Sequence, residues 1–346
     1  MKPLLSVIIP MYNSEPFIEQ TVRNILSGGI DTQKFEIILI DDGSKDKTKD
    51  ICLSKFRDCK NVFLYCKKNG GIADSRNYGI EKAKGKFLFF HDHDDLLVVK
   101  NMAKIISVLE KTESDLLIFE TQSLRKNNTE QLCVVNGDFA EKQLSLDDKT
   151  ALFKTLFFIQ DKTNAADFPV SRFGHIWSTI IKREFVKKNN IKFVIRCDYE
   201  DDFSFLLEML CVPSCCVSCH KILIYQWAIR EESESHILRF DVNFMDRVEN
   251  YNNYLCQRIE NSAYSSYKLQ AISNIVWRKT RDFLLLFGRG DNDDKTYKNF
   301  LFFCKKYSIR DKMIRKTFFR KTRNQRLLST LFFLRFFRVC YKIIMK

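Results

Sequence analysis

The sequence predicts an open, doubly wound α/β sheet followed by a helical extension with a basic end. Two observations predict the sheet: short apolar runs alternate with helical patterns over roughly the first 120 residues, and each of the first four runs ends in polar residues. This β-α-β order favours parallel strands covered by helices on both faces. A third observation, an excess of Lys and Arg after residue 309, predicts the extension.

Four strands are expected before residue 91. Their residues are largely apolar, which is typical of strands buried on both faces of a parallel sheet. The runs are Leu5–Pro10, Phe35–Ile40, Asn61–Cys66 and Lys86–Phe90. Between them, apolar residues at helical spacing predict helices over 15–26, 44–56 and 71–83, and Ser44 is a candidate N-cap of the second helix.

The rest of the chain has a less regular pattern. Helical patterns cover 96–111, 151–160, 178–189, 202–211 and 242–287, and strand patterns cover 116–122 and 217–229. Between 125 and 148 the pattern is weaker and more polar, which indicates loops or short additional strands. With 346 residues, of which 45% are hydrophobic and 29% charged, the composition is that of a globular protein with room for a substantial core.

Membrane spans and disulfides are not expected. No stretch approaches the roughly 20 apolar residues that cross a bilayer. The 12 cysteines lie in a large chain whose N-terminus runs directly into a strand pattern, which predicts reduced thiols and a cytoplasmic location. Cys211, Cys215, Cys216, Cys219 and His220 resemble a zinc cluster, but the adjacent cysteines and their apolar neighbours favour buried thiols.

Positive charge is concentrated at the C-terminal end. Residues 310–346 hold 12 Lys or Arg and one acid, a net charge of +11, which leaves +3 of the total +14 for the rest of the chain. Arg335, Arg338, Lys342 and Lys346 share one helical face among aromatic and aliphatic residues, which suits an anionic membrane surface. The alternative is a helix that packs on the main domain. No recognition motif accompanies the charge, so nucleic acid is not an expected partner.

Polar residues follow each of the first four strands. They are Tyr12–Glu15, Asp41–Ser44, Asn69–Asn77 and Asp92–Asp95. Ligands bind at the carboxyl ends of the strands in an open α/β sheet, so the four sets are expected to meet at one edge. Gathered carboxylates repel unless a cation lies among them, and Mg²⁺ or Mn²⁺ takes carboxylate oxygens. Asp92, Asp94 and Asp95 are therefore candidate metal ligands.

The other sets suggest contacts with a nucleotide. Asp42 can accept hydrogen bonds from a base or ribose, Tyr12 can stack on a base, and Arg76 can pair with an anionic or carbonyl group. Gly70 and Gly71 would let the backbone approach a ligand closely. Simpler interpretations stay open: a turn and helix cap at 41–44, a core aromatic at position 12, and a solvated helix N-terminus near 202.

Four motifs carry a resemblance to a known family. Ser6–Asn13, Asp41–Ser44, Gly71 to Gly79 and Asp92–Asp95, in this order and spacing, resemble family 2 glycosyltransferases of the GT-A fold, of the bacterial surface-polysaccharide type. One departure is that Leu96–Val99 follows the aspartates where such sequences often have a Pro. The resemblance implies a nucleotide-sugar-binding half (1–125), an acceptor and catalytic half of the same domain (126–238), and a helical C-terminal region (239–346). It implies that the donor is bound by Pro10, Tyr12, Asn13, Glu15, Asp42, Gly71, Arg76, Asp94 and Arg230.

The resemblance also implies a catalytic base in the second half. Family members usually carry an acidic pair followed by an aromatic residue and, two residues later, a Phe. Counting from Ile191–Phe193 puts this pair on Asp201 and Asp202. Asp202 is then the expected base, with Asp201 or Glu200 as the alternatives.

Together these expectations describe a metal-dependent inverting glycosyltransferase that uses Mn²⁺ or Mg²⁺. It would move a sugar from a nucleoside-diphosphate donor, expected to be a UDP-sugar, to a hydroxyl of a glycan or lipid-linked acceptor in surface polysaccharide synthesis, at the inner face of the cell membrane. A loop with Arg230, Ser235 and His236 would close over the diphosphate. Two alternatives stay open. A nucleotidyltransferase would usually have a Gly-rich basic loop where this chain has Pro10–Asn13, and the other alternative is a non-catalytic sugar-nucleotide-binding protein.

Overall fold

The structure is a computed structural model that describes most of the chain up to residue 275. The described residues are 2–125, 128–135, 143–159, 170, 173–194, 201–228, 244–272 and 274–275. The chain divides into two compact units, the first made of 1–156, 162–195 and 200–231 and the second of 157–161, 196–199 and 232–346. None of the described helices is long and apolar enough to cross a membrane. The basic tail, Glu200, Arg230, Ser235 and His236 lie outside the described residues.

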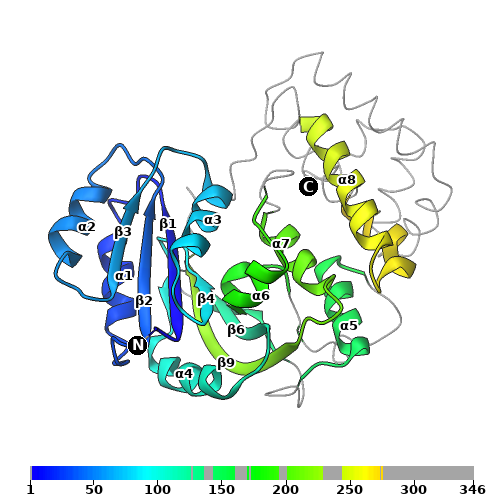
Figure 1. Cartoon of the computed structure of the whole chain (residues 1–346), viewed down its shortest axis with the longest axis horizontal. Helices are drawn as coiled ribbons and strands as arrows, with labels where there is room; N and C mark the ends of the chain where they lie inside the picture. The colour runs from blue at the N-terminus through cyan, green and yellow to red at the C-terminus, as the bar shows by residue number, and fades with distance from the viewer. Residues whose placement is uncertain are drawn as a thin grey trace. The chain divides into compact units, whose positions relative to one another are not determined.

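A nine-stranded mixed sheet forms the centre of the first unit (Figure 1). The strands are β1 (Leu5–Met11), β2 (Phe35–Asp41), β3 (Val62–Cys66), β4 (Phe87–Phe90), β5 (Leu96–Leu97), β6 (Leu116–Arg125), β7 (Asn128–Cys133), β8 (Thr179–Lys182) and β9 (Val217–Ala228). Their order is β3-β2-β1-β4-β8-β6-β9-β5, and β7 pairs with β6. The first four strands are parallel to one another, whereas β8 runs antiparallel to β4 and β6. The predicted doubly wound α/β sheet is confirmed, with a mixed second half.

Helices connect these strands and cover the sheet. They are α1 (Ile18–Leu26), α2 (Thr48–Phe56), α3 (Ile72–Lys82), α4 (Met102–Lys111), α5 (Leu146–Leu156), α6 (Arg183–Lys188) and α7 (Asp201–Leu210) in the first unit, and α8 (Phe244–Glu260) in the second. Short 3₁₀ helices are η1 (Val99–Asn101), η3 (Ile176–Ser178) and η5 (Ser265–Tyr267). The helices α3 and α7 are the most important for the candidate site, because α3 carries Arg76 and α7 begins with Asp201 and Asp202.

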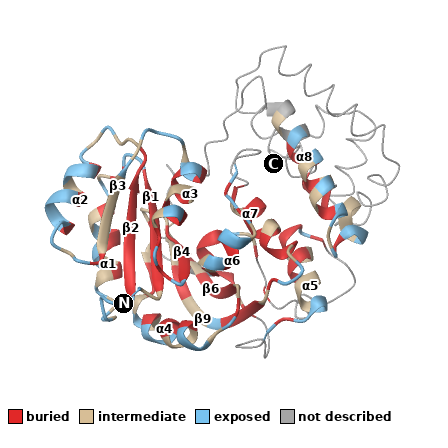
Figure 2. Cartoon of the chain, in the orientation of Figure 1, coloured by how far each residue is buried: buried red, intermediate tan, exposed pale blue. Residues whose placement is uncertain are grey.

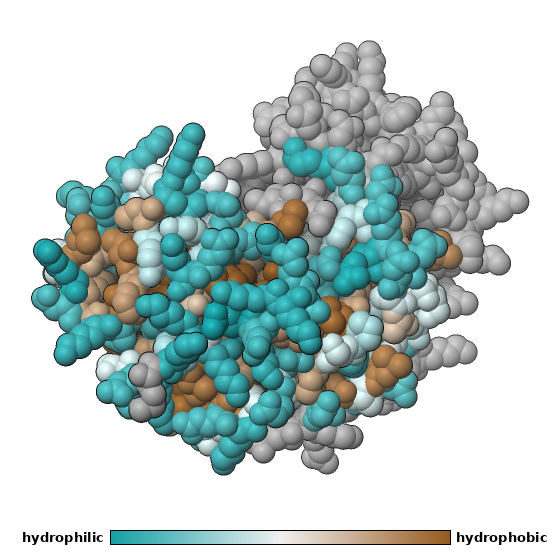
Figure 3. Space-filling view, viewed as in Figure 1, coloured by the Kyte–Doolittle hydropathy of each residue, from teal (hydrophilic) through white to brown (hydrophobic). Residues whose placement is uncertain are grey.

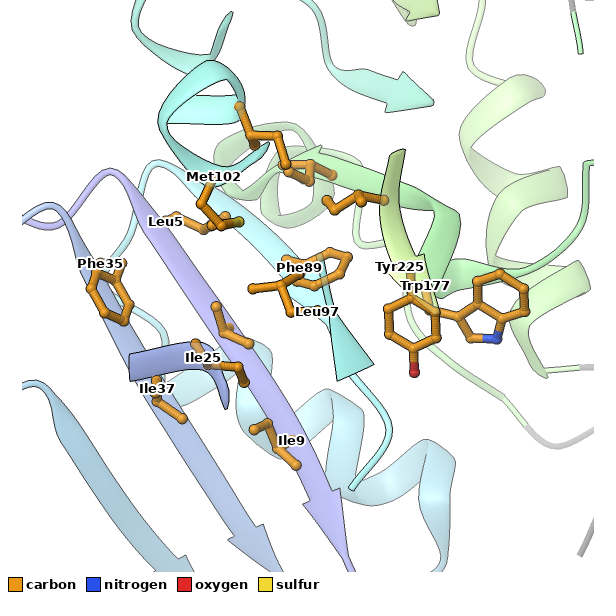
Figure 4. Close-up of a cluster of buried hydrophobic side chains, with 14 of the residues drawn as sticks. Leu5, Ile9, Ile25, Phe35, Ile37, Phe89, Leu97, Met102, Trp177 and Tyr225 are labelled. Atoms are coloured by element: carbon orange, nitrogen blue, oxygen red, sulfur yellow. The ribbon is translucent and has the colours of Figure 1, made fainter. Parts of the chain in front are cut away.

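The core lies around β1 and β2, which are buried at every position (Figure 2). Their side chains pack with those of β4, α1 and α4 in one apolar cluster, part of which is drawn in Figure 4. The helix α3 approaches β1 closely because position 79 is a glycine, where a Cβ atom would collide with the Ile8 side chain. This close packing positions Arg76, one turn before Gly79, over the end of the sheet. The outer face in Figure 3 is mostly hydrophilic, with apolar residues in small groups.

Three of the helices predicted up to residue 111 begin three or more residues later than the sequence suggests, and the first of them, α1, begins at Ile18 rather than residue 15. The helix α2 begins at Thr48 rather than Ser44, and Ser44 is not its N-cap. The segment before Thr48 is held by Asp46, whose Oδ1 accepts the Thr48 N–H at 3.0 Å, and by contacts with the β1 loop. The helix predicted from residue 96 begins at Met102, because Leu96–Leu97 pairs with β9 as the short strand β5.

The helix predicted over 178–189 is wrong in its first part. Thr179–Lys182 forms β8, which lies between β4 and β6, and only Arg183–Lys188 is helical. The run of Thr and two Ile residues is β-branched and fully buried at its first three positions, which suits a central strand. Its four residues are too few to show a period that separates strand from helix.

Candidate active site

The loops that follow β1 and β2 are tied together by reciprocal hydrogen bonds. The Asn13 N–H donates to Ser44 Oγ at 3.0 Å, and the Lys45 N–H donates to Asn13 Oδ1 at 2.8 Å. The Lys47 N–H donates to Glu15 Oε2 at 3.0 Å. Asn13 adopts a left-handed conformation with φ 49°, which Asn tolerates better than most residues. The side chains of Asn13 and Glu15 therefore fix the neighbouring loop at this end of the sheet.

Tyr12 and Pro10 occupy different environments in the same segment. Pro10 is buried within β1, beside Ile40 of β2. Tyr12, just beyond the strand, is 40% exposed, which contradicts the alternative that it is a core aromatic. Its ring is accessible for stacking at the carboxyl end of the sheet.

Asp42 binds the glycine turn that precedes α3. Its Oδ1 accepts the Gly70 N–H at 2.9 Å and its Oδ2 accepts the Gly71 N–H at 2.7 Å, and Gly71 has φ 85°. Lys67 Nζ lies 2.5 Å from Asp42 Oδ1 and 2.6 Å from Asp74 Oδ2. Burial alone would lower the pKa of Lys67, but its bonds to the two carboxylates outweigh burial and raise that pKa. Asp42 is thus a buried anion that orders the turn, and it does not cap α2.

Arg76 holds three carboxylates from two distant parts of the chain. Its Nη1 donates to Asp201 Oδ2 at 2.7 Å and to Asp202 Oδ1 at 2.5 Å, and its Nη2 donates to Asp92 Oδ1 at 3.2 Å. The guanidinium is 5.3 Å from the centroid of the Phe193 ring, and the whole residue is only 3% exposed. Burial opposes the charge of Arg76, yet the three carboxylates outweigh it and raise the pKa of Arg76.

Asp201 and Asp202 begin α7 and differ in their surroundings. Their side chains are 9% and 17% exposed, so Asp202 is the more accessible. Asp202 Oδ2 also accepts the Ile176 N–H at 3.0 Å. Burial raises the pKa of both carboxyls above the ordinary range, although Arg76 opposes this shift. The alternative of a solvated helix N-terminus does not fit, because both carboxylates are partly or wholly buried against Arg76.

The Asp92–Asp95 segment is anchored by hydrogen bonds from β9. The Tyr225 hydroxyl donates to Asp95 Oδ2 at 2.6 Å, and the Ala228 N–H donates to Asp95 Oδ1 at 2.8 Å. The Asp92 N–H donates back to the Tyr225 hydroxyl at 3.1 Å. Burial, followed by the charges of Asp92 and Asp94, raises the pKa of Asp95 to about 8. Asp95 is therefore bound on both oxygens and only 1% exposed.

The three candidate metal ligands are not equivalent. Among the described residues, no group of three or more His, Cys, Asp or Glu side chains is arranged to hold an ion by itself. Asp95 has both oxygens engaged, whereas the Asp92 side chain is 29% exposed and Asp94 is half-buried. Mg²⁺ is usually bound by one or two carboxylates together with water and substrate phosphates. Asp92 and Asp94 fit this donor set better than Asp95 does.

The cysteine-rich stretch at 211–220 agrees with the interpretation of buried thiols. Cys211, Cys215 and Cys219 are buried and form no disulfide, and burial raises the pKa of the Cys219 thiol to about 12. His220 Nε2 lies 2.9 Å from Ser218 Oγ. These groups lie in the core of the first unit.

Several residues of the site are not indicated by the sequence motifs. Lys67 follows β3 directly, so its place at a strand end could have suggested it. Tyr225 and the Ile176 N–H have no local signal, because their partners are separated from them by 130 and 26 positions respectively. The predicted contact of Arg230 lies outside the described residues.

The fold and the site together define an α/β domain of the GT-A class, with acidic residues gathered at the carboxyl ends of parallel strands. Residues 6–170 match the family described as Glycosyl transferase family 2. This segment, which contains the four parallel strands and the aspartates that follow β4, is therefore similar to family 2 glycosyltransferases.

Two curated relatives come from Bacillus subtilis. The minor teichoic acid biosynthesis protein GgaB is 23% identical over 261 residues, which are 71% of this chain and 27% of GgaB. The uncharacterized glycosyltransferase EpsJ is 25% identical over 211 residues, 60% of this chain and 56% of EpsJ. The chain thus spans between about a quarter and about half of the length of these relatives.

Among solved structures, the fold is similar to that of S. aureus TarS, residues 1–349, in complex with UDP-GlcNAc. The TM-score is 0.66 and the sequence identity 16%, over 99% of this chain and 90% of that one. At this identity the likeness shows the fold alone.

Proposed function

We propose that the protein transfers a sugar from a nucleoside-diphosphate donor, a UDP-sugar, to an acceptor hydroxyl with inversion at the anomeric carbon. The observation that carries this proposal is the cluster around Arg76. Arg76 connects two sets of acidic residues. The aspartates that follow β4 suit a diphosphate and its metal ion, and the carboxylates that begin α7 suit a general base. A single-displacement transfer needs these two functions on opposite sides of one sugar.

The donor nucleotide is proposed to bind at the ends of β1, β2 and β3. Tyr12 is exposed and can stack on a base. Asp42 Oδ1 already accepts the Gly70 N–H and Lys67 Nζ, whereas Oδ2 accepts the Gly71 N–H and keeps a second lone pair for a ligand. Gly71, at φ 85°, keeps the turn free of a Cβ atom where a ligand would approach. Asn13 and Glu15 shape this surface because their side chains accept hydrogen bonds from the loop after β2, and Pro10 supports it from within β1.

Asp92 and Asp94 are proposed to hold Mn²⁺ or Mg²⁺ together with the donor diphosphate. A divalent ion bound there would neutralise the negative charge that develops on the leaving nucleoside diphosphate. Asp95 is proposed as an anchor for the segment rather than a ligand, since both of its oxygens already accept hydrogen bonds.

Asp202 is proposed as the general base that takes the proton of the acceptor hydroxyl. It is the more exposed carboxylate of the pair, and the Ile176 N–H and Arg76 fix its orientation. A pKa raised by burial makes it a better proton acceptor than a solvated carboxylate. Asp201, which is more buried, is proposed to hold Arg76, and Glu200 stays an alternative base.

The acceptor is proposed to be a glycan or lipid-linked sugar in surface polysaccharide synthesis. The name of the relative GgaB, a minor teichoic acid biosynthesis protein, supports this class of product. The net charge of +11 over residues 310–346 supports peripheral binding at the inner face of the membrane.

A panel of UDP- and GDP-sugars tests the function directly. The purified chain is incubated with each donor and Mn²⁺, with and without a mixed glycolipid acceptor fraction, and release of nucleoside diphosphate is measured. We expect release with one or a few UDP-sugars, increased by acceptor and abolished by a chelator. Release that is the same for every donor, or the absence of any metal-dependent release, would contradict the proposal.

A further inference from the structure

Tyr225 lies at a junction between the apolar core and the aspartate segment. Its ring is fully buried and stacks on Trp177, with centroids 5.0 Å apart and planes 12° apart (Figure 4). Phe89 meets the ring edge-on at 6.3 Å, and His91 does so at 5.0 Å. The ring is therefore held from several sides, which fixes the direction of its hydroxyl.

The Tyr225 hydroxyl makes two hydrogen bonds, and both of its partners belong to the Asp92–Asp95 segment. It donates to Asp95 Oδ2 and accepts from the Asp92 N–H, so it contacts the first and the last of the four residues. The segment is closed internally by the Asp95 N–H, which donates to the Asp92 carbonyl at 3.3 Å. The interior of the segment is tied to α1, because Thr21 Oγ1 donates to the His93 carbonyl at 2.7 Å.

We propose that Tyr225 is a positioning residue that sets the geometry of the Asp92–Asp94 carboxylates for a divalent ion and a nucleoside diphosphate. The inference rests on the proposed function. A hydroxyl that bridges a backbone N–H and a buried carboxylate fixes the turn between them. Residues that orient metal ligands without touching the metal commonly contribute about 10–100-fold to affinity or activity.

Tyr225→Phe removes only the hydroxyl and keeps the stacked ring. We expect the Mn²⁺ concentration that half-saturates UDP binding, followed as the shift in unfolding temperature, to rise about tenfold or more. Relative to the wild type, donor turnover by Tyr225→Phe should fall less at saturating Mn²⁺ than at low Mn²⁺. Tyr78→Phe is the matched control, because Tyr78 lies on α3 with its ring against Tyr65 and Lys82, and its Mn²⁺ dependence should equal that of the wild type.

Asp95→Asn provides a second variant and completes a double-mutant cycle. If Tyr225 acts through Asp95, the double variant should be little worse than the poorer single variant, because both changes disrupt one contact. Additive effects of the two changes on the half-saturating Mn²⁺ concentration would overturn the inference. A Tyr225→Phe protein with wild-type Mn²⁺ dependence, or an Asp95→Asn protein with wild-type Mn²⁺ dependence, would overturn it as well.

The wild-type protein separates this failure from failure of the proposed function. If the wild type shows no Mn²⁺-dependent stabilisation by UDP, the proposed function is wrong and the inference falls with it. If the wild type shows it and Tyr225→Phe matches the wild type, only the positioning role is wrong. A purely structural role would lower the unfolding temperature of Tyr225→Phe equally with and without Mn²⁺ and UDP, which also contradicts the proposal.

Discussion

Arg76 Nη1 donates a hydrogen bond to Asp202 Oδ1 at 2.5 Å, between residues 126 positions apart in the chain. The same guanidinium binds Asp201 and Asp92, so one buried cation balances three carboxylates. Removing it would leave three acids close together in a largely buried site. This contact therefore links the stability of the fold to the chemistry of the site.

Arg76→Met should destabilise the protein strongly. Loss of one partner from a buried ion pair typically costs about 3–5 kcal/mol, since the remaining charges stay desolvated. Chemical denaturation followed by circular dichroism measures the change. Arg23→Met is the matched control, because Arg23 also pairs with a carboxylate on a helix but is 58% exposed, and its effect should stay within about 1 kcal/mol. Similar losses of unfolding free energy in the two variants would show that the Arg76 cluster contributes no more to stability than a surface ion pair does.

Asp202→Asn should remove sugar transfer while leaving donor binding intact. Loss of a general base typically lowers kcat by about 10²–10⁴-fold, and Asn keeps the size and one acceptor oxygen. Initial rates of transfer and UDP affinity measured on the same preparation test the two statements. Glu184→Gln, an exposed acid in the first turn of α6, should behave as the wild type.

The pH dependence of transfer gives a second check on Asp202. Only the ionised carboxylate can accept a proton, so kcat/KM should rise with pH through the pKa of Asp202. Burial raises that pKa, so the rise should come at a higher pH than for a solvated Asp, whose pKa is near 3.9. A rise centred at or below the pKa of a solvated Asp would contradict Asp202 as the rate-limiting base.

Much of this site could be predicted from the sequence, because it depends on local order. The four strands of the parallel half are apolar runs, and the polar residues after them converge by topology alone. The long-range partners could not be predicted. Nothing near Arg76 indicates that it binds the start of α7, and nothing near Asp95 indicates a tyrosine on β9. The pattern over Thr179–Lys182 predicts a helix wrongly, because four residues followed by a true helix carry no distinct period.

Charge reversal in the basic tail tests membrane binding. Arg335→Glu together with Arg338→Glu should weaken sedimentation of the full chain with vesicles of phosphatidylserine, since each basic residue near an anionic surface contributes about 1 kcal/mol. Vesicles of phosphatidylcholine alone should bind the wild type poorly, and added salt should reduce binding to the anionic vesicles. Arg23→Glu with Lys55→Glu, two exposed residues of the first unit, is the control of equal charge change. Equal binding by both double variants would contradict a role for the tail.

Metal-free stability should depend on pH through Asp95. Its folded-state pKa of about 8 lies above the unfolded value near 3.9, so the folded protein binds the proton more tightly. The resulting stabilisation is fully present below about pH 4 and is lost as pH rises through about 8. Asp95→Asn lacks this titration. The unfolding free energy of the wild type should therefore fall relative to that of the variant as pH rises from 4 to 8. A difference that is constant over this range would contradict a raised pKa.

Asp94→Ala should abolish metal-dependent binding of UDP. A ligand at 100 times its Kd stabilises a protein by about 2.7 kcal/mol, so wild-type protein with UDP and Mn²⁺ should unfold several degrees higher than with UDP alone. The variant should lose the rise in unfolding temperature that Mn²⁺ adds to UDP, measured against its own unliganded unfolding temperature. Asp58→Ala, at an exposed position after α2, should keep the full increment. If Asp94→Ala kept it and Asp92→Ala lost it, the metal would be held mainly by Asp92, the carboxylate that also contacts Arg76.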